Sequence, residues 1–403
     1  MDPYILDWIH LLARWAHLIV GIAWIGSSFY FVFTDLSLKP GPHLNKKASG
    51  ETWQVHGGGF YHIQKYLVAP DKMPSQLHWF KYEAYMTWIS GMVLLATIYY
   101  VGADSFLIDP AVMDLTPTQA IFTSVIMLAG GWIFYDFLCR SSIGKNTRLL
   151  FFSVFILTVF AAWAFTNLFG GRAAFLHSGA LIGSMMVGNV FFVIIPNQKK
   201  VVKALIAGEQ PAAYLGMQAK QRSLHNTYLT LPVLLMMISN HFPMIFGHQH
   251  SWAVFAAILV IGGLVRHYFV ASHAGSTSKL LPFLLPISGV LTVLLAVGMT
   301  YNPANVGQGT DAPGGIDVDP KQAFAIVRTH CSSCHSSLPT NEDFDVAPSD
   351  VIFDSVDQVR INADRMITQA VKTTAMPLGN ATEMSAADRK VLGDWLVAGA
   401  PVE

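Results

Sequence analysis

The sequence predicts an all-α fold, in which a polytopic membrane bundle of about eight helices is followed by a small globular domain. The chain of 403 residues is 53% hydrophobic and only 12% charged, and its mean hydropathy is +0.43, as is typical of a protein embedded in a bilayer. Apolar segments of spanning length recur up to residue 301, after which the composition changes. These observations favour a membrane domain at 1–301, a linker at 302–319 and a separate domain at 320–403.

Eight apolar segments are long enough to cross about 30 Å of hydrocarbon. They lie near residues 5–34, 79–101, 117–138, 149–169, 173–195, 224–246, 251–271 and 280–300. The first begins almost at Met1 and lacks a small-residue cleavage site after a basic region, so we expect a retained membrane helix and not a signal peptide. Its length allows it to tilt in the membrane.

The distribution of basic residues predicts the orientation of the bundle. Lys and Arg total 25, as do Asp and Glu, so there is no basic excess that would indicate a nucleic-acid partner. With the N-terminus outside, the basic residues concentrate in cytoplasmic loops at 35–78, 139–148, 196–223 and 272–279, whereas the external loops hold only Arg172. This positive-inside pattern places both ends of an even-numbered bundle outside, with membrane lipid around it.

The C-terminal domain is predicted to begin and end with a helix. Residues 320–330 form an amphipathic stretch that leads into a cysteine motif. Residues 385–399 place four apolar side chains on one helical face, namely Val391, Leu392, Trp395 and Leu396. Ser385 is a suitable N-cap for this helix and Gly399 a suitable stop.

The motif R-T-H-C-S-S-C-H-S-S contains Cys331, Cys334 and His335 in a C-x-x-C-H arrangement. Two thiols about one helical turn apart can each form a thioether with a haem vinyl group, while the next histidine ligates the iron. The alternatives are a zinc site or a chance spacing, and the helices expected on both sides favour haem c. The remaining cysteine, Cys139, cannot complete a disulfide framework.

A methionine is expected as the second axial ligand of this haem. The candidates are Met366, Met376 and Met384. Met376 precedes Pro377, so its backbone is extended and lies in a loop that can lay the thioether over the haem, whereas Met366 lies in a helical stretch and is expected in the core. This domain resembles a class I cytochrome c. Covalent haem attachment of that kind takes place on the outer face of the bacterial cytoplasmic membrane, so the resemblance implies an inner-membrane protein whose N-terminus and C-terminal domain lie in the periplasm.

The first predicted helix carries a polar stripe. Asp7, His10, Arg14 and His17 are spaced by three, four and three residues, so they share one helical face. Such a stripe is costly in hydrocarbon and must face a protein interior or a wet cavity. Its role is either functional or that of an interhelical hydrogen-bonding seam, and Arg14 has the further alternative of a buried pair with Asp7.

Histidines in the predicted spans fall at different depths. Toward the outside lie His10, His177 and His241, and His17 is near the middle. Imidazoles on facing helices of one bundle are what an internal haem b requires, because each iron needs ligands from two sides. The alternative for each histidine is a satisfied polar contact within the bundle.

The first cytoplasmic loop contains W-Q-V-H-G-G-G-F-Y-H-I-Q-K-Y. Its three successive glycines allow backbone N–H groups to approach a ligand, and its aromatic side chains are able to stack on a flat ring. The alternative is that the glycine run only makes a turn.

The opening W-A-H-L-I-V-G-I-A-W-I-G-S-S-F-Y-F, the loop V-H-G-G-G-F-Y, the predicted spans and the C-x-x-C-H domain together resemble the bacterial membrane-bound urate oxidases fused to a cytochrome c, the PuuD type. The resemblance covers essentially the whole chain. It implies that the membrane domain oxidises urate to 5-hydroxyisourate. Electrons would then leave through the cytochrome c part to the respiratory chain, to a soluble cytochrome c or a cytochrome c oxidase, rather than directly to oxygen.

The catalytic candidates come from the residues themselves. Arg14 is expected to neutralise an anionic ring or a haem propionate, and His17 either ligates iron or takes a proton from urate. A single haem accepts one electron, so a two-electron oxidation requires a second store or a tolerated radical, which favours an internal haem b. Two alternatives stay open: a module that passes electrons from quinol to a cytochrome, and a transporter that carries a redox domain.

Overall fold

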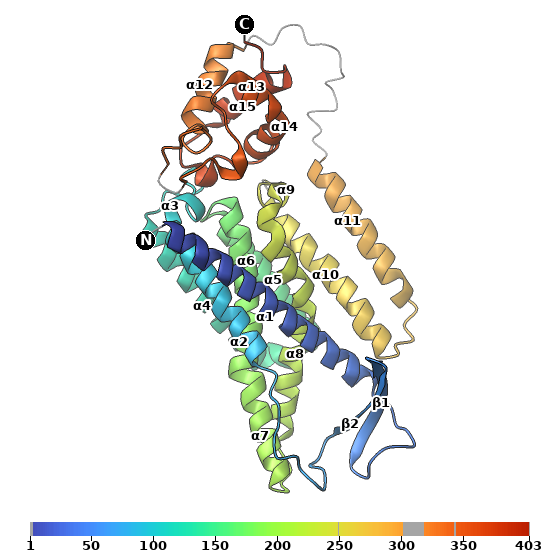
Figure 1. Ribbon diagram of the computed structural model, residues 1–403. Coiled ribbons are helices and arrows are strands. Elements are labelled where there is room, and N and C mark those ends of the chain that lie inside the picture. Colours follow the sequence, from blue (N-terminus) through green and yellow to red (C-terminus); the bar gives the residue numbers. More distant parts are fainter. Residues whose placement is uncertain (1–2, 249, 301–317, 342–343, 403) are drawn as a thin grey trace.

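The computed structural model describes the chain except for residues 1–2, 249, 301–317, 342–343 and 403. Most of the predicted linker at 302–319 therefore lies outside the described residues. Long helices form an elongated bundle that carries the C-terminal domain at one end and a β-hairpin at the other (Figure 1). We call these the domain end and the hairpin end.

The long helices of the bundle run alternately between the two ends (Figure 1). They are α1 (Pro3–Ser37), α2 (Tyr82–Leu94) with its π-helical continuation η1 (Leu95–Tyr100), α4 (Pro117–Arg140), α5 (Thr147–Thr166), α6 (Gly171–Gly188), α8 (Ala213–Ile238), α10 (Ser251–His273) and α11 (Leu284–Thr300). Short elements connect them, namely α3 (Ala103–Phe106), η2 (Ser142–Lys145), η4 (Ser239–His241), α9 (Pro243–Phe246) and η5 (Leu281–Phe283). Both α1 and the C-terminal domain start at the domain end, as the even-numbered topology predicts (Figure 1).

Among the described residues, six helices are long and apolar enough to cross a membrane. They span Tyr4–Ser37, Pro117–Arg140, Thr147–Thr166, Gly171–Ile206, Ser251–His273 and Leu281–Met299. The predicted count of eight is not confirmed. The other two predicted spans are helical, but the α2–η1 segment is rich in tyrosine and α8 begins with the polar stretch Ala213–Ser223, so neither is counted by length and composition.

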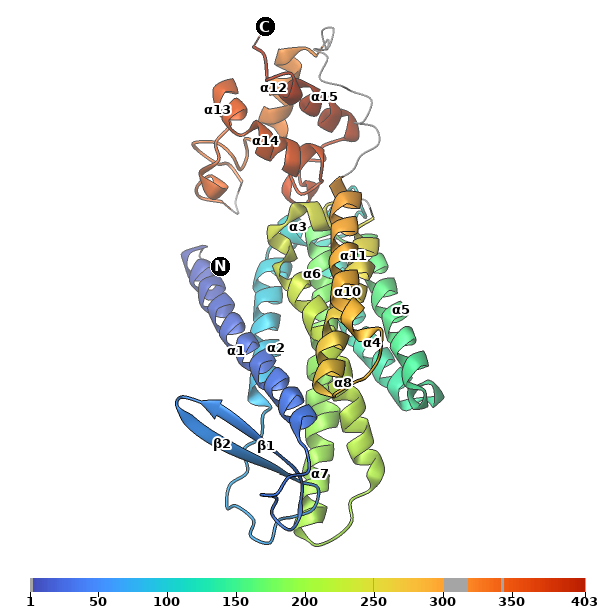
Figure 2. The same cartoon turned by 90° about the vertical axis from the view of Figure 1, so that its right-hand side faces the viewer.

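The fifth predicted span is longer than expected, because α6 continues without a break into η3 (Asn189–Ile194) and α7 (Ile195–Ile206). Figure 2 shows α7 and the beginning of α8 extending beyond the other helices at the hairpin end. The segment predicted as a loop at 196–223 is thus mostly a helical pair. The reason is that α7 is amphipathic and basic, so it pairs with α8 without needing lipid around it.

The segment expected to be a cytoplasmic loop contains a β-hairpin, so the all-α prediction is wrong there. Strands β1 (Ala48–His56) and β2 (Gly59–Tyr66) pair in antiparallel register. Gly57 and Gly58 have φ values of 58° and 77° and form the two-residue turn, which confirms that the glycine run makes a turn. The residues on either side of this turn alternate between aromatic and polar, which is typical of a β-hairpin, but the prediction considered only helices.

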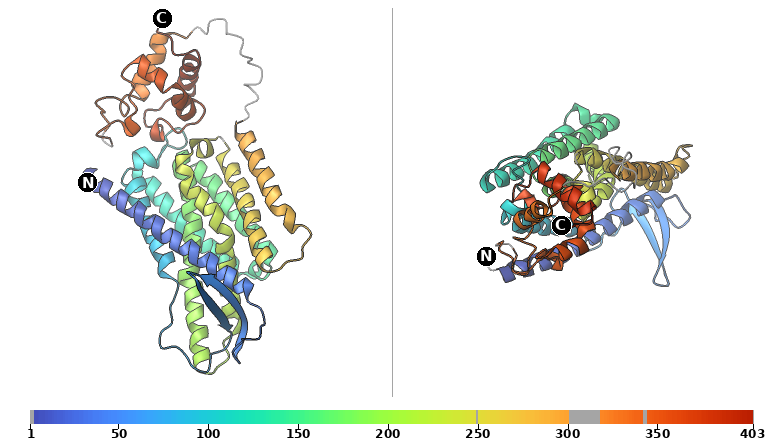
Figure 3. Two further views of the ribbon diagram at one scale, coloured as in Figure 1. Left: turned by 45° about the vertical axis from the view of Figure 1, so that its right-hand side comes forward. Right: turned by 90° about the horizontal axis from the view of Figure 1, so that it is seen from above.

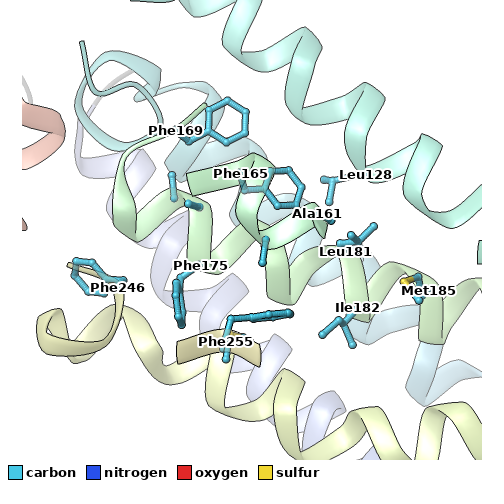
Figure 4. Close-up of a cluster of buried hydrophobic side chains, with 14 of the residues drawn as sticks. Leu128, Ala161, Phe165, Phe169, Phe175, Leu181, Ile182, Met185, Phe246 and Phe255 are labelled. Carbon is cyan, nitrogen blue, oxygen red and sulfur yellow. The ribbon is translucent and has the colours of Figure 1, made fainter. Parts of the chain in front are cut away.

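The largest apolar core of the bundle lies where α4, α5, α6 and α10 meet. Figure 4 shows its aromatic side chains, with Phe165 near Phe169 and Phe175 of α6 near Phe255 of α10. By contrast, α1 runs obliquely along one side of the bundle and buries little of its surface (Figure 3).

The C-terminal domain is built from short helices around its own core. They are α12 (Pro320–His330), η7 (Pro348–Asp350), α13 (Val356–Ile361), α14 (Ala363–Met366), η8 (Ile367–Val371), η9 (Leu378–Asn380) and α15 (Ala386–Val397). Ser385 caps α15 through a capping box with Asp388, and Gly399 follows the helix with φ of 84°, so both predicted ends are confirmed. The predicted apolar face is confirmed as well, because Leu392, Trp395 and Leu396 are buried and Val391 packs against them.

Candidate functional site

Two cations approach one buried tyrosine near the domain end of the bundle. Tyr99 of η1 is 3% exposed, and both Arg14 of α1 and Arg172 of α6 act electrostatically on its hydroxyl. The Arg172 guanidinium also lies 5.6 Å from the ring centroid of Phe246 in α9. The structure therefore brings together one predicted residue, Arg14, and three that the sequence analysis did not propose for the site.

These cations lack anionic partners. Neither Arg14 nor Arg172 forms an ion pair with a carboxylate in the described part of the chain, so the alternative pairing of Arg14 with Asp7 is not present. The buried Nε of Arg172 and the buried Nε2 of His10 have no hydrogen-bond partner. Arg172 is half-buried and Arg14 is exposed on the side of the bundle, and with no carboxylate to neutralise them these cations are suited to attract an anion.

His17 joins α1 to α2. Its Nδ1 lies 2.9 Å from the carbonyl oxygen of Thr87 and 3.0 Å from Ser90 Oγ. Because the carbonyl can only accept, Nδ1 is the donor in the neutral ring and Nε2 carries the lone pair. No residue that the structure describes bonds Nε2, which leaves it available as a base or as a ligand.

His177 is fully buried and uses both ring nitrogens within the protein. Its Nδ1 donates to the carbonyl oxygen of Ala173 at 2.7 Å, and its Nε2 accepts from Ser124 Oγ at 2.8 Å. Ser124 in turn pairs with the Tyr100 hydroxyl at 2.8 Å. The imidazole is thus a satisfied core group, and iron ligation would require the Ser124 bond to break.

The four histidines predicted to hold an internal haem b do not form a ready ligand pair. His241 lies exposed in η4 at the domain end, and His177 has both nitrogens engaged. His10 and His17 each keep a nitrogen without a partner, but both belong to α1, whereas axial ligands must come from opposite sides of the iron. In this arrangement, these four histidines do not supply two opposed ligands for an internal haem b.

A second polar group lies toward the hairpin end and is internally paired. Arg222 of α8 pairs with Asp136 of α4 at 2.6 Å and with Asn189 Oδ1 at 3.1 Å. Asn189 also donates to the Tyr135 hydroxyl and to Asn226 Oδ1, each at 2.9 Å. We call this set, together with His225, which shares a 2.7 Å hydrogen bond with Tyr135, the Arg222 network.

Arg266 of α10 is a further buried cation, 6% exposed, whose Nε has no partner. Its guanidinium lies 3.8 Å from the ring centroid of Phe29 in α1, so an aromatic face takes the place of hydrogen bonds. A groove of about 670 Å³ between α4, α5 and α6 is lined mainly by apolar side chains such as Phe134 and Leu181. It lacks the polar contacts that an anionic ring needs.

In the C-terminal domain, the described contacts of the C-x-x-C-H residues are compatible with a covalent haem. Cys331 and Cys334 lie at the end of α12 and form no disulfide. His335 Nδ1 donates to the carbonyl oxygen of Val351 at 3.0 Å, which fixes the ring and leaves Nε2 for a metal. These residues fit the group.

The predicted methionine ligand lies in a fixed loop. Met376 is partly buried, its N–H donates to the Gln369 carbonyl at 2.9 Å and its own carbonyl accepts from Arg389 at 2.7 Å. Met366 and Met384 are 5% and 3% exposed and belong to the domain core. Met376 as the axial ligand stays a prediction.

The zinc alternative finds no support among the described residues, where no cluster of three or more His, Cys, Asp or Glu side chains is able to hold a metal ion. Burial raises the pKa of the Cys331 thiol to about 12, against the opposing charge of Arg389. Zinc requires thiolates, so this environment disfavours it.

Sequence reasoning missed Arg172 and Tyr99 as site residues. Arg172 was noted only as the single basic residue of the external loops, and that isolation was the available signal, because the positive-inside rule leaves such a residue unexplained. Tyr99 gave no signal in sequence, since tyrosine is common at membrane interfaces.

Fold and site together define a multi-helix membrane protein with an unpaired cationic group beneath a separate C-terminal domain. Residues 3–300 match the family model described as urate oxidase N-terminal. The chain belongs to this family, as the sequence resemblance predicted, and the membership makes it an oxidoreductase of the urate oxidase type. No curated protein and no solved structure matches the chain.

Proposed function

We propose that the bundle oxidises urate to 5-hydroxyisourate near its domain end and that the electrons leave through the C-terminal domain, acting as a cytochrome c. The observation that carries the proposal is a pair of cations, Arg14 and Arg172, that both act electrostatically on Tyr99 and have no carboxylate partner in the described chain. Family membership over residues 3–300 supports urate as the substrate, and the two arginines support its binding near the domain end.

Urate is an anion at neutral pH, and its flat ring suits a guanidinium and an aromatic face. Arg14 and Arg172 provide the positive charge, and Phe246, already beside Arg172, provides an aromatic surface at the same place. Charge-assisted hydrogen bonds of this kind each contribute about 1.5–3 kcal/mol. The two arginines therefore bind and orient the substrate.

The reaction balances without oxygen as a reactant. Urate and water give 5-hydroxyisourate, two protons and two electrons. His17 is placed one helical turn from Arg14, and its Nε2 lone pair takes one of these protons while the Thr87 carbonyl holds the ring in that tautomer. A positioned general base contributes roughly 10²–10⁴-fold in rate.

A haem c held by Cys331, Cys334, His335 and Met376 would supply one-electron redox chemistry on the far side of the site. The concentration of basic residues in the loops of the opposite side supports the proposal that this side faces the periplasm of a bacterial inner membrane. From there, a soluble cytochrome c or a cytochrome c oxidase is the proposed acceptor.

The test is an optical spectrum of the purified full chain under anaerobic conditions. Adding urate is expected to produce a reduced haem c spectrum, together with 5-hydroxyisourate in solution. A haem reduced by quinol but not by urate would indicate a quinol-to-cytochrome module instead. Urate uptake into vesicles without product would indicate a transporter, and either result overturns the proposal.

Haem attachment has its own test. Cys331→Ala combined with Cys334→Ala is expected to abolish haem staining of the denatured protein on a gel, because both thioethers are lost. Met376→Ala is expected to lower the haem potential, whereas Met366→Ala, its matched control in the core, leaves it unchanged. If the two methionine variants exchange these behaviours, Met366 is the ligand.

A further inference from the structure

The loop that carries Met376 contacts the bundle. Several of its residues are buried: Thr373 is 7% exposed, Ala375 8% and Asn380 4%. Ala375 belongs to the apolar core of the bundle and not to that of the C-terminal domain. The loop at 373–380 therefore faces the bundle.

The contact is closest at Gly379. A Cβ added to this glycine would lie 2.7 Å from the carbonyl oxygen of Ile108, 2.8 Å from that of Ser105 and 3.2 Å from that of Asp104. Gly379 also has φ of 58°, a conformation that other residues adopt at a cost. Only glycine allows the two backbones to approach this closely.

A second contact lies beside the first. A Cβ added to Gly247, which follows α9, would lie 2.6 Å from Thr373 Cβ. The residue before it, Phe246, is the one whose ring lies beside Arg172. We call residues 373–380 the docking loop. This loop thus contacts the end of α9, the helix that lines the proposed urate site.

Charge favours the same arrangement. Asp109 of the bundle and Arg389 of α15 attract each other, although burial raises the pKa of the Asp109 carboxyl. Arg389 also fixes the docking loop, donating to the carbonyl oxygens of Ala370 and Met376 and to Asn380 Oδ1. The Arg389 guanidinium therefore both fixes the conformation of the loop and attracts the bundle residue Asp109.

We propose that residues 373–380 are the face through which the C-terminal domain receives electrons from the bundle, with Gly379 as the positioning residue. The inference rests on the proposed function for the identity of the donor. Urate is oxidised in the bundle and gives up its two electrons singly, through a urate radical. A haem c held by Cys331 and Cys334 would accept the first electron and pass it to the proposed cytochrome acceptor before it accepts the second. Because the Met376 loop docks beside Arg172 and Phe246, the distance over which each electron is transferred is short.

Gly379→Ala tests the proposal, with Gly399→Ala as its matched control. Both place an alanine at positive φ, but nothing lies within 4 Å of a Cβ at Gly399. Hydrogen exchange of the backbone amides at 103–109 is expected to rise in Gly379→Ala and to stay at the wild-type rate in Gly399→Ala. Urate-dependent haem reduction is expected to slow about tenfold in Gly379→Ala only, with dithionite reduction and haem potential unchanged.

A second variant approaches the interface from the bundle side. Asp109→Asn leaves the C-terminal domain untouched and is expected to raise exchange at 103–109 in the same direction. Unchanged exchange in both variants, or equal urate-dependent rates in the two glycine variants, overturns the docking proposal. If urate fails to reduce the wild-type haem, the proposed function fails instead, and the exchange measurements still decide whether the loop docks.

Discussion

The polar groups at the two ends of the bundle differ in how completely they are paired. In the Arg222 network, the guanidinium has a carboxylate and an amide oxygen as partners, and the Tyr135 hydroxyl contacts both Asn189 and His225. Near the domain end, Arg14 and Arg172 have no carboxylate partner in the described chain. Both groups lie in the same bundle and have similar chemistry.

On the proposed function, the difference separates a polar group that serves the fold from one that serves a ligand. A satisfied network fixes helices against one another, and breaking it leaves charges uncompensated. An unpaired cation stabilises nothing by itself and is retained where something binds to it. Arg266 shows that an aromatic face is a third solution, since Phe29 covers its guanidinium.

The largest expected effect is on the stability of the hairpin-end group. Arg222→Leu removes one partner of a buried pair and is expected to lower the free energy of unfolding by about 3–5 kcal/mol. Arg140→Leu is the matched control, because Arg140 pairs with the same Asp136 but its side chain is 56% exposed; its cost is expected to be about 0–1 kcal/mol. Thermal unfolding in detergent measures both, and similar losses would show that burial does not decide the difference.

The next effect is on substrate binding at the domain end. Arg14→Gln and Arg172→Gln are each expected to raise the KM for urate about 10- to 100-fold, because one charge-assisted contact is lost. Melting temperature and dithionite-reducible haem stay unchanged. Arg148→Gln, on an exposed arginine at the start of α5, serves as the control. A lowered melting temperature with an unchanged KM would remove the arginine from the site and assign it to the fold.

The smallest expected effect compares two tyrosine hydroxyls. Tyr135→Phe removes two hydrogen bonds at once, those of its hydroxyl to His225 and to Asn189, and is expected to cost about 1–3 kcal/mol. Tyr100→Phe removes a single hydrogen bond to Ser124, and Ser124 keeps its hydrogen bond to His177. The free energy of unfolding is therefore expected to fall by about 1 kcal/mol. Urea or thermal unfolding of the two variants measures the difference. The comparison of the two ends is wrong if Tyr100→Phe proves the more costly.

Sequence reasoning was most successful where local pattern decides structure. The Ser385 cap, the Gly399 stop and the apolar face between them depend on neighbours within a few residues, and all three are confirmed. The turn at Gly57 and Gly58 is confirmed as well, because it also depends on neighbouring residues. The two strands that flank it were not predicted, although their alternating polar and apolar residues are typical of β-strands.

Features that depend on distant segments were beyond the sequence. The continuation of α6 into α7 depends on pairing with α8, and the approach of Arg172 to Tyr99 depends on how α6 and η1 pack. Histidine spacing gave no way to tell His177, which is satisfied by Ser124, from His17, which keeps a free nitrogen. Such distinctions require the three-dimensional arrangement of partners that lie 50 or more residues away.

The close approach at Gly379 also constrains the order of assembly. The loop at 373–380 meets the backbone of residues 104–108 at Gly379 and meets Gly247 at Thr373, and Gly247 is in place only after α9 has folded onto α6. The docking loop is synthesised after both. Domains fold largely in the order of synthesis. The C-terminal domain therefore docks only after the helices that contact it have folded. A docked C-terminal domain thus indicates that these helices of the bundle folded first.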